Sequence, residues 1–270
     1  MSDANNAPLI SRREGAVLVL SNNNPAARNA LSPGFYAAFT EALQAAQNDP
    51  TVGAIVLTGE GGHFCAGGDL RQLAKRRDLP EADRRAKLEG LHDLVRAVRD
   101  CPKPVIAAVE GAAAGAGLSL ALACDMLVAA RNAVFSVAYV KVGLTPDGGA
   151  TAFLAEFVSR QVLTELCLTG ERISGERLHA LGPVNRLAEP GQALAQALVL
   201  AEQLASGPDQ AMASIKALCR EAYGNTLEEQ LEQEALRMVR AQATEESREG
   251  MAAFLEKRTP DFTQLRQSRV

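Results

Sequence analysis

Two glycine-rich segments of this 270-residue chain have the residue types that backbone amides need to bind an anion or a polarised carbonyl. They are residues 63–70 (HFCAGGDL) and residues 110–118 (EGAAAGAGL), and each follows an apolar run and leads into a helical pattern. Small residues let the backbone approach a ligand closely, and a helix N-terminus adds free N–H groups. Either segment alone also fits a tight strand-to-helix turn. Together they predict a pair of converging donors, which an enolate or a tetrahedral intermediate requires.

Better-known glycine motifs do not fit the second segment. The GxGxxG spacing of dinucleotide sites is absent, and so is the lysine of a P-loop. The GxSxG nucleophile pattern is broken, because Ala121 stands two residues after Ser119. A dinucleotide-binding oxidoreductase therefore rests only on glycine turns that follow strands, and Ser119 is a poor candidate nucleophile.

Asp147 is the carboxylate that stands out, in a Pro-Asp-Gly-Gly turn before a helical pattern that starts near Ala150. An aspartate in that place is often a helix N-cap. The alternative is a general base in a largely apolar cleft, where burial would raise its pKa. The residues by themselves leave both interpretations open.

The elements that must position these groups follow from hydrophobic periodicity. Five apolar runs predict buried strands, over residues 16–20, 54–57, 105–109, 125–130 and 135–137. Helical patterns separate them, over residues 34–48, 84–99 and 118–123. Strands that alternate with helices predict an α/β core.

The remaining sequence changes character after about residue 190. Only helical patterns follow, over residues 192–205, 209–223, 227–244 and 245–257. We therefore expect an α/β core over residues 1–190 and a C-terminal helical region over residues 191–270. That region is expected to pack on the core or on a neighbouring copy.

Composition excludes several classes of protein. Hydrophobic residues make up 47% and charged residues 22%, and the net charge is −4. Without a long basic block or an apolar run of membrane length, we expect no nucleic-acid partner and no membrane partner. The N-terminus lacks the pattern of a signal peptide, so a cytoplasmic location is expected. Five widely spaced cysteines without CxxC or HxxxH spacing predict free thiols and no metal site.

Five segments of the chain resemble those of the crotonase superfamily, the enoyl-CoA hydratase/isomerase proteins, in the order in which that family has them. Residues 24–32 (NPAARNALS) are similar to its NRPxxRNALS segment, and residues 64–70 (FCAGGDL) to its AGxD turn. The other three are residues 103–125, 143–149 and 249–260. The resemblance implies a spiral of ββα units followed by a helical oligomerisation region that forms homotrimers, often paired into hexamers.

The resemblance also implies an acyl-CoA substrate, from fatty acid or aromatic acid degradation, and site residues to match. No separate cofactor is expected, because coenzyme A is carried as part of the substrate. The two oxyanion donors map to Gly68 and Ala116. Phe254 and Lys257 map to a helix that often reaches the nucleotide end of CoA, sometimes from a neighbouring subunit. The full set of expected substrate-binding residues is Arg28, Ala30, Ala66, Asp69, Leu70, Ala112, Gly115, Ser119, Tyr139, Pro146, Phe254 and Lys257.

The departures from the family pattern bear on the reaction. Hydratases of the family use two glutamates to hold and activate water, and these positions map to Ser119 and Tyr139. Asp147 maps to the aspartate that some family isomerases use to move a proton, and residues 140–149 look most like phenylacetate-type isomerases and oxepin-CoA-processing relatives. We therefore expect double-bond isomerisation through an enolate, with Asp147 as the proton shuttle. A hydratase (a lyase) with a displaced acid/base group, and a CoA-thioester-binding protein without catalysis, are the alternatives.

The segment that would shape the acyl pocket, residues 72–91, is highly charged. It contains the pairs Arg76-Arg77 and Arg84-Arg85. These arginines form either a solvated face or a contact with the phosphates of CoA.

Overall fold

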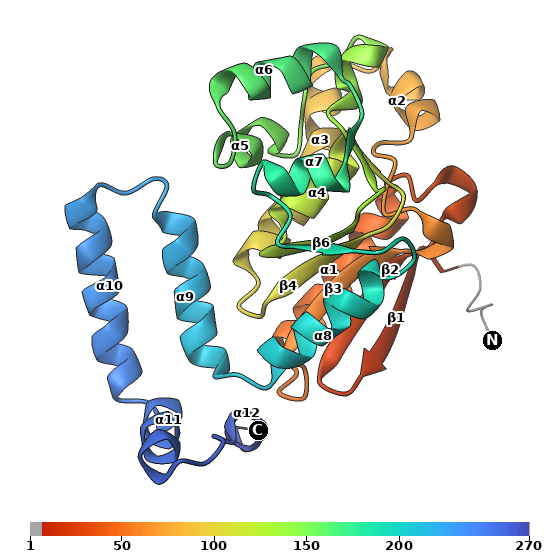
Figure 1. The fold of residues 1–270 in the computed structure, drawn as a ribbon. Coiled ribbons are helices and arrows are strands. Elements are labelled where there is room, and N and C mark those ends of the chain that lie inside the picture. The colour runs from red at the N-terminus through yellow and green to blue at the C-terminus, as the bar shows by residue number, and fades with distance from the viewer. Residues whose placement is uncertain (1–6, 270) are drawn as a thin grey trace.

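A six-stranded sheet forms the centre of the computed structural model, which describes residues 7–269 (Figure 1). Strand β1 pairs antiparallel with β2, and every later pairing in this sheet is parallel. The turns that follow β3 and β4 therefore leave the sheet at the same edge. In spatial order the strands are β1 (Leu9–Glu14), β2 (Val17–Asn22), β3 (Ala54–Gly59), β4 (Val105–Val109), β6 (Met126–Ala130) and β9 (Arg186–Ala188).

A second, three-stranded sheet begins after the turn that follows β4. It consists of β5 (Ala112–Ala114), β7 (Val134–Ser136) and β8 (Ile173–Ser174), in that order. β5 begins three residues after the end of β4, so the chain passes directly from one sheet into the other. This step brings the second glycine-rich segment alongside the first.

Helices cover both faces of the large sheet because successive strand residues point to opposite sides. On one face α1 (Pro33–Asn48), α3 (Glu81–Asp100) and α4 (Ala116–Ala123) pack on residues such as Ile55 and Leu57. The opposite face carries Val17, Val56 and Ile106 and is covered by α8 (Ala193–Ala205). The α8 residues in this contact include Ala193, Ala197 and Ala201. Alanines four residues apart form one smooth stripe along a helix, which lets α8 lie close to the sheet.

Shorter elements surround the edge where the two glycine turns emerge. The helices are α2 (Leu70–Arg76), α5 (Ala150–Ala155), α6 (Arg160–Thr169) and α7 (Gly175–Ala180). The 3-10 turns are η2 (Pro25–Ala27), η3 (Glu60–Gly62) and η4 (Ala138–Val142). In Figure 1, α2, α5 and α6 lie together at the top of the molecule, above the large sheet.

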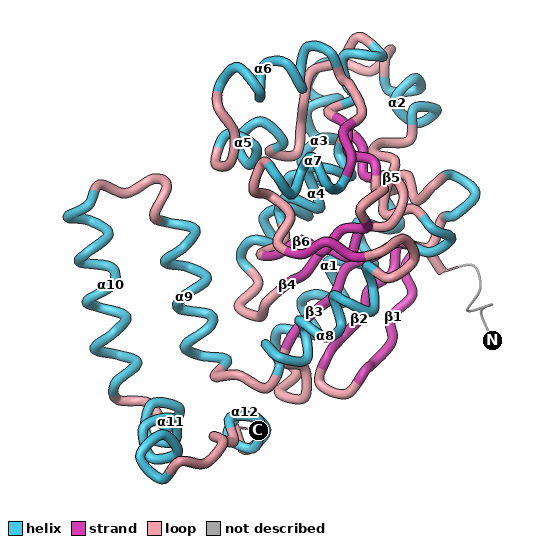
Figure 2. The backbone as a smooth tube through the Cα atoms, in the orientation of Figure 1, coloured by secondary structure: helices cyan, strands magenta, loops and turns pink. Residues whose placement is uncertain are grey.

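The C-terminal helices extend away from the sheets. They are α9 (Asp209–Glu221), α10 (Leu227–Gln242), α11 (Glu245–Glu256) and α12 (Phe262–Gln267). Figure 2 shows α9 and α10 as a hairpin that stands apart from the core. Lys216 on α9 pairs with Asp125 at 2.6 Å, and Arg266 on α12 donates to the Ala205 carbonyl at 2.7 Å. These bonds tie the extension to the core at its base.

The sequence-based expectation of an α/β core is confirmed, with element ends mostly within three residues of their predicted positions. A division of the chain at residue 190 stays a prediction, since α8 lies beyond it and packs on the sheet. Strand β1 escaped prediction because its sequence, LISRRE, is polar and exposed on its outer side. All five cysteines are free thiols. Within residues 7–269, no helix combines the length and the apolar character needed to cross a bilayer.

Candidate active site

The two glycine-rich turns are held together by backbone hydrogen bonds. The Cys65 amide donates to the Ala112 carbonyl at 2.9 Å, and the Ala114 amide donates to the Cys65 carbonyl at 3.0 Å. Cys65 and Ala113 thus form an isolated parallel bridge between the turn after β3 and strand β5. The relative position of the two turns is therefore set by the main chain.

Glycine is required where the turns meet. Gly67 has φ +96°, and a Cβ on it would lie 2.6 Å from the Ala114 carbonyl oxygen and 3.5 Å from the Ala116 nitrogen. Gly115 has φ +52° and ψ −127°, a conformation that side chains strongly disfavour. Each glycine immediately precedes one of the two expected donors, Gly68 and Ala116. The close approach of the turns thus brings those two residues together.

The N–H groups of Gly68 and Ala116 are free to bind a ligand. Ala116 is the first residue of α4, which begins two residues earlier than the sequence pattern indicates. Its amide therefore belongs to the first helical turn, where no intrahelical acceptor exists. Within residues 7–269, neither amide donates to a protein acceptor, and both residues line the same cavity. These are the properties that a pair of oxyanion donors needs.

Asn29 fixes the first turn from behind, a role that the sequence did not reveal. Its amide nitrogen donates to the carbonyls of Glu60 at 2.7 Å and His63 at 2.6 Å. Nearby, the Leu31 amide donates to the Gly67 carbonyl at 2.8 Å. Asn29 is buried and has φ +58°, a backbone conformation that asparagine tolerates better than most residues. Its signal in the sequence was its place in residues 24–32, the segment that resembles NRPxxRNALS.

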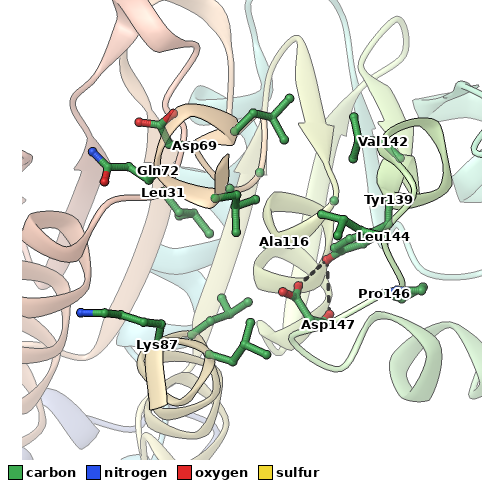
Figure 3. A pocket seen from close by; sticks show the side chains of 18 of the residues that line it. Leu31, Asp69, Gln72, Lys87, Ala116, Tyr139, Val142, Leu144, Pro146 and Asp147 are labelled. Atoms are coloured by element: carbon green, nitrogen blue, oxygen red, sulfur yellow. Dashed lines mark hydrogen bonds between the residues drawn. The ribbon is translucent and has the colours of Figure 1, made fainter. Parts of the chain in front are cut away.

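The turns open into a cavity of about 460 Å³, seen in Figure 3. Its walls come from α1, α2, α3, the start of α4, and the segment from η4 to the turn before α5. Most of the lining is aliphatic, with Leu73, Leu88, Leu91, Val142 and Leu144 as examples. Such a lining keeps water away and strengthens electrostatic interactions inside.

Asp147 points into this cavity as a carboxylate held by a tyrosine. The Tyr139 hydroxyl donates to Asp147 Oδ1 at 2.7 Å (Figure 3). Burial raises the pKa of Asp147, while the Tyr139 hydrogen bond and the charge of His92 act in the opposite direction. The N-cap interpretation is wrong, because the N-cap of α5 is Gly149 and no side chain caps that helix. The side chain of Asp147 instead lines the cavity, and its role as a general base stays a prediction.

Tyr139 and Ser119 form a hydrogen-bonded support for that carboxylate. The Ser119 hydroxyl donates to the Asp147 main-chain carbonyl at 2.9 Å and lies 3.3 Å from the Tyr139 hydroxyl. Burial raises the pKa of Tyr139 well above its usual range, so Tyr139 is a neutral donor. Ser119 is fully buried behind Tyr139 rather than on the cavity wall. Ser119 and Tyr139, the two positions that the resemblance maps to glutamates of hydratases, thus both hold Asp147.

The structure brings some of the expected site residues together and not others. On the cavity wall lie Ala66, Gly68, Asp69, Leu70, Gly115, Ala116, Tyr139, Pro146 and Asp147. Off the wall lie Arg28, Ala30, Ala112, Ser119, Phe254 and Lys257.

The C-terminal pair lies far from this cavity. Phe254 is on α11, which lies at the bottom of Figure 1 whereas the cavity-lining helix α2 lies at the top. Its side chain is 82% exposed, and Lys257 ends α11 in a left-handed conformation. Contacts of both residues with CoA stay a prediction.

Tyr36 and His92 also line the wall, and neither was anticipated. Burial raises the pKa of Tyr36 to about 12, so its hydroxyl is protonated at neutral pH. His92 follows Leu88 by four residues on α3, and helical spacing places such residues on one face. That spacing was the available signal for His92, and the sequence offered none for Tyr36. Gln72 and Lys87 on the same wall belong to residues 72–91, the segment expected to shape the acyl pocket.

Comparison with known proteins agrees with this geometry. The family model described as enoyl-CoA hydratase/isomerase matches residues 12–266. The 1,2-epoxyphenylacetyl-CoA isomerase of Escherichia coli is 37% identical, over 94% of this chain and 98% of its own. The 2,3-dehydroadipyl-CoA hydratase of the same organism is 36% identical over the same shares. A crystal structure of an enoyl-CoA hydratase from Polaromonas sp. JS666 is 51% identical, with a TM-score of 0.92 over 94% of this chain and 98% of that one.

The fold is of crotonase type, and its largely apolar cavity combines two free backbone amides with two carboxylates, Asp69 and Asp147. The chain belongs to the enoyl-CoA hydratase/isomerase family, the crotonase superfamily. It is an enzyme of that family, and acyl-CoA thioesters are its class of substrate.

Proposed function

We propose that this enzyme moves a double bond within an acyl-CoA thioester, with Asp147 as the proton shuttle and an oxyanion hole at Gly68 and Ala116. One observation carries the proposal: the Asp147 carboxylate and both free amides line the same largely apolar cavity. Similarity to an E. coli 1,2-epoxyphenylacetyl-CoA isomerase supports it.

The thioester carbonyl accepts hydrogen bonds from the amides of Gly68 and Ala116. Asp147 removes a proton from the carbon α or γ to the carbonyl, and the electron pair moves onto the thioester oxygen as an enolate. Each oxyanion donor typically contributes about 2.7–4 kcal/mol to such a transition state. Asp147 returns the same proton to the other carbon, which completes the shift of the double bond. The step needs no cofactor, because CoA is part of the substrate.

The support around Asp147 favours proton transfer over water addition. Addition of water to an enoyl thioester in this family uses two glutamates, and their positions hold Ser119 and Tyr139. Tyr139 is neutral and donates a hydrogen bond to Asp147. A single carboxylate suffices for a shuttle, since the group that takes the proton is the group that returns it.

Asp147→Asn tests the shuttle. Asparagine keeps the size of the side chain and can still accept from Tyr139, but it cannot take a proton. We expect the kcat for isomerisation of a 3-enoyl-CoA to fall roughly 10²–10⁴-fold, the usual share of a general base. Asp93→Asn, which changes an exposed carboxylate outside the cavity, is the control. Turnover within a few-fold of the unmodified enzyme in Asp147→Asn would contradict the proposal.

Hydration with a displaced acid/base is a second candidate, and His92 is the observation that favours it. His92 lines the same cavity, and its Nδ1 lies 3.6 Å from Glu89 Oε1. Together with Asp147 it could hold a water molecule. Parallel assays of crotonyl-CoA hydration and 3-enoyl-CoA isomerisation separate the two, and faster hydration that His92→Gln abolishes would favour the hydratase.

We also propose that the enzyme assembles as a homotrimer or a dimer of trimers through its C-terminal helices. Large apolar side chains are exposed along α9, α10 and α11, where a single chain gives them no partner. They include Ile215, Leu227, Leu236, Met238, Val239, Met251, Phe254 and Leu255. Light scattering should give a mass of three or six chains, and a monomeric mass would refute this assembly.

A further inference from the structure

A second cavity adjoins the first and shares part of its wall. It has a volume of about 820 Å³ and lies between α2, the N-terminal part of α3 and the segment that follows η4. Six residues line both cavities: Leu70, Leu73, Arg76, Leu88, Val142 and Leu144. A ligand that fills the first cavity can therefore continue into the second without leaving the protein surface.

The lining of the second cavity combines aliphatic and basic side chains. Four arginines and a single carboxylate, Glu81, complete its wall: Arg76, Arg77, Arg84 and Arg85. Arg85 pairs with Glu89 at 2.6 Å. No carboxylate of the described chain lies within ion-pair distance of Arg76, Arg77 or Arg84. The cavity thus combines apolar surface with unpaired positive charge.

Arg76 stands at the junction of the two cavities. It lines both of them, and its charge acts on the pKa of Tyr36, which lines the first cavity only. It is half-buried, and a charge in such a place gains from an anionic partner. Guanidinium groups bind carboxylates and phosphates through paired, charge-assisted hydrogen bonds.

The position of the second cavity indicates whether an anionic group that binds there belongs to the acyl chain or to the CoA phosphates. Of the residues that the resemblance assigns to substrate binding, only Leu70 lines it, and Phe254 and Lys257, which the resemblance places at the nucleotide end of CoA, do not. Val142 and Leu144, by contrast, belong to the segment that leads to Asp147. The second cavity therefore continues from the acyl side of the site, and the anion that reaches it belongs to the acyl group rather than to the CoA phosphates.

We propose that the second cavity is the distal part of the acyl site and that it selects acyl-CoA thioesters with a carboxylate at the end remote from the thioester. The aliphatic lining covers the methylene chain, and Arg76, with Arg77 and Arg84, binds the terminal carboxylate. This inference rests on the proposed function for the position of the thioester, but it does not depend on which reaction follows.

Calorimetric binding of saturated acyl-CoA thioesters tests the inference without any turnover. Pairs of equal chain length, from six to twelve carbons, end in a methyl group or in a carboxylate. At the chain length that reaches Arg76, we expect the unmodified enzyme to bind the carboxylate-ended member more tightly. Arg76→Gln should reduce that preference roughly tenfold, the low end of a charge-assisted hydrogen bond. Lys75→Gln, one residue earlier on α2 and on neither cavity wall, should retain it.

Three outcomes would overturn the inference. The first is an unmodified enzyme that never prefers the carboxylate-ended thioester. The second is an equal loss of affinity in Arg76→Gln for both members and for free CoA, which would assign the arginine to the phosphates. The third is a preference that survives in both Arg76→Gln and Arg84→Gln. Because saturated thioesters undergo no proton transfer, none of these outcomes bears on Asp147, and a failed Asp147→Asn test leaves the binding result intact.

Discussion

Tyr139→Phe isolates the hydrogen bond that controls the proposed base. The substitution removes one hydroxyl and keeps the ring that fills the space beside Gly115. In the unmodified enzyme the 2.7 Å hydrogen bond from Tyr139 to Asp147 Oδ1 lowers the pKa of that carboxyl, and the substitution deletes this bond. Burial, which raises the pKa, is then opposed only by the charge of His92. The carboxylate should become a stronger base that is protonated over a wider range of pH.

The size of the effect follows from the type of bond. A hydrogen bond to a charged group contributes about 1.5–3 kcal/mol, and one pKa unit corresponds to about 1.36 kcal/mol. The pKa of Asp147 should therefore rise. In a profile of kcat/KM against pH, the acid limb should move upward, and at a fixed pH on that limb the rate of Tyr139→Phe should fall roughly tenfold or more below that of the unmodified enzyme. Above that limb the rate should stay within a few-fold of the unmodified enzyme, because a stronger base offsets a less ordered one.

Ser119→Ala is the matched control for this experiment. Ser119 contacts the Tyr139 hydroxyl and the Asp147 main chain, but it makes no bond to the carboxylate. In the pH profile of Ser119→Ala, the acid limb should move by less than about half a pH unit, because the change acts on Asp147 only indirectly, through Tyr139. An unmoved acid limb in Tyr139→Phe, with an unchanged melting temperature, would refute the role given to Tyr139. Loss of activity at every pH would instead make Tyr139 a participant in the proton transfer.

Two further predictions concern the turns and the stability of the site. Gly67→Ala places a Cβ 2.6 Å from the Ala114 carbonyl oxygen and should lower kcat/KM roughly 10²-fold or more. The control is Gly62→Ala, which is also at positive φ but has open space around it and should lower stability without lowering kcat/KM. Equal losses of kcat/KM in the two variants would contradict the idea that the Gly67–Ala114 contact sets the geometry of the oxyanion hole. Asp147→Asn should melt at a higher temperature than the unmodified enzyme near pH 7, because a carboxyl whose pKa is raised in the folded state destabilises the fold as the pH rises. In thermal denaturation the difference in melting temperature should disappear below about pH 3.9, where the carboxyl of the unfolded chain is also protonated. A difference that does not depend on pH would contradict a raised pKa for Asp147.

The fold was largely predictable because its signals are local. Buried parallel strands such as β4 are continuous apolar runs, and the sequence places that strand at residues 105–109, where the structure has it. The exposed edge strand β1 has no such run and was missed. The start of α4 was placed two residues late, since alanine and glycine at 116 and 117 carry no capping signal.

The candidate active site was predictable from the sequence only where its groups are backbone amides. Small residues in order along the chain indicate Gly68 and Ala116, and the structure finds both amides free and in one cavity. Tyr36 and His92 come from helices whose rotation about their axes is set by tertiary packing. Ser119 shows the opposite limit, because the resemblance assigns this position to substrate binding, whereas its side chain is buried against Tyr139.

The division between main-chain donors and side-chain base has a consequence for how such an enzyme diversifies. Any residue except proline supplies an amide at positions 68 and 116, so the proposed donor pair does not depend on the side chains at those positions, provided that Gly67 and Gly115 keep the two turns in place. The proposed proton-transfer group depends on Ser119, Tyr139 and Asp147, which come from three separate segments and contact one another. A change in reaction type therefore requires coordinated replacement at these three positions, and descendants of one ancestor should inherit them as a set.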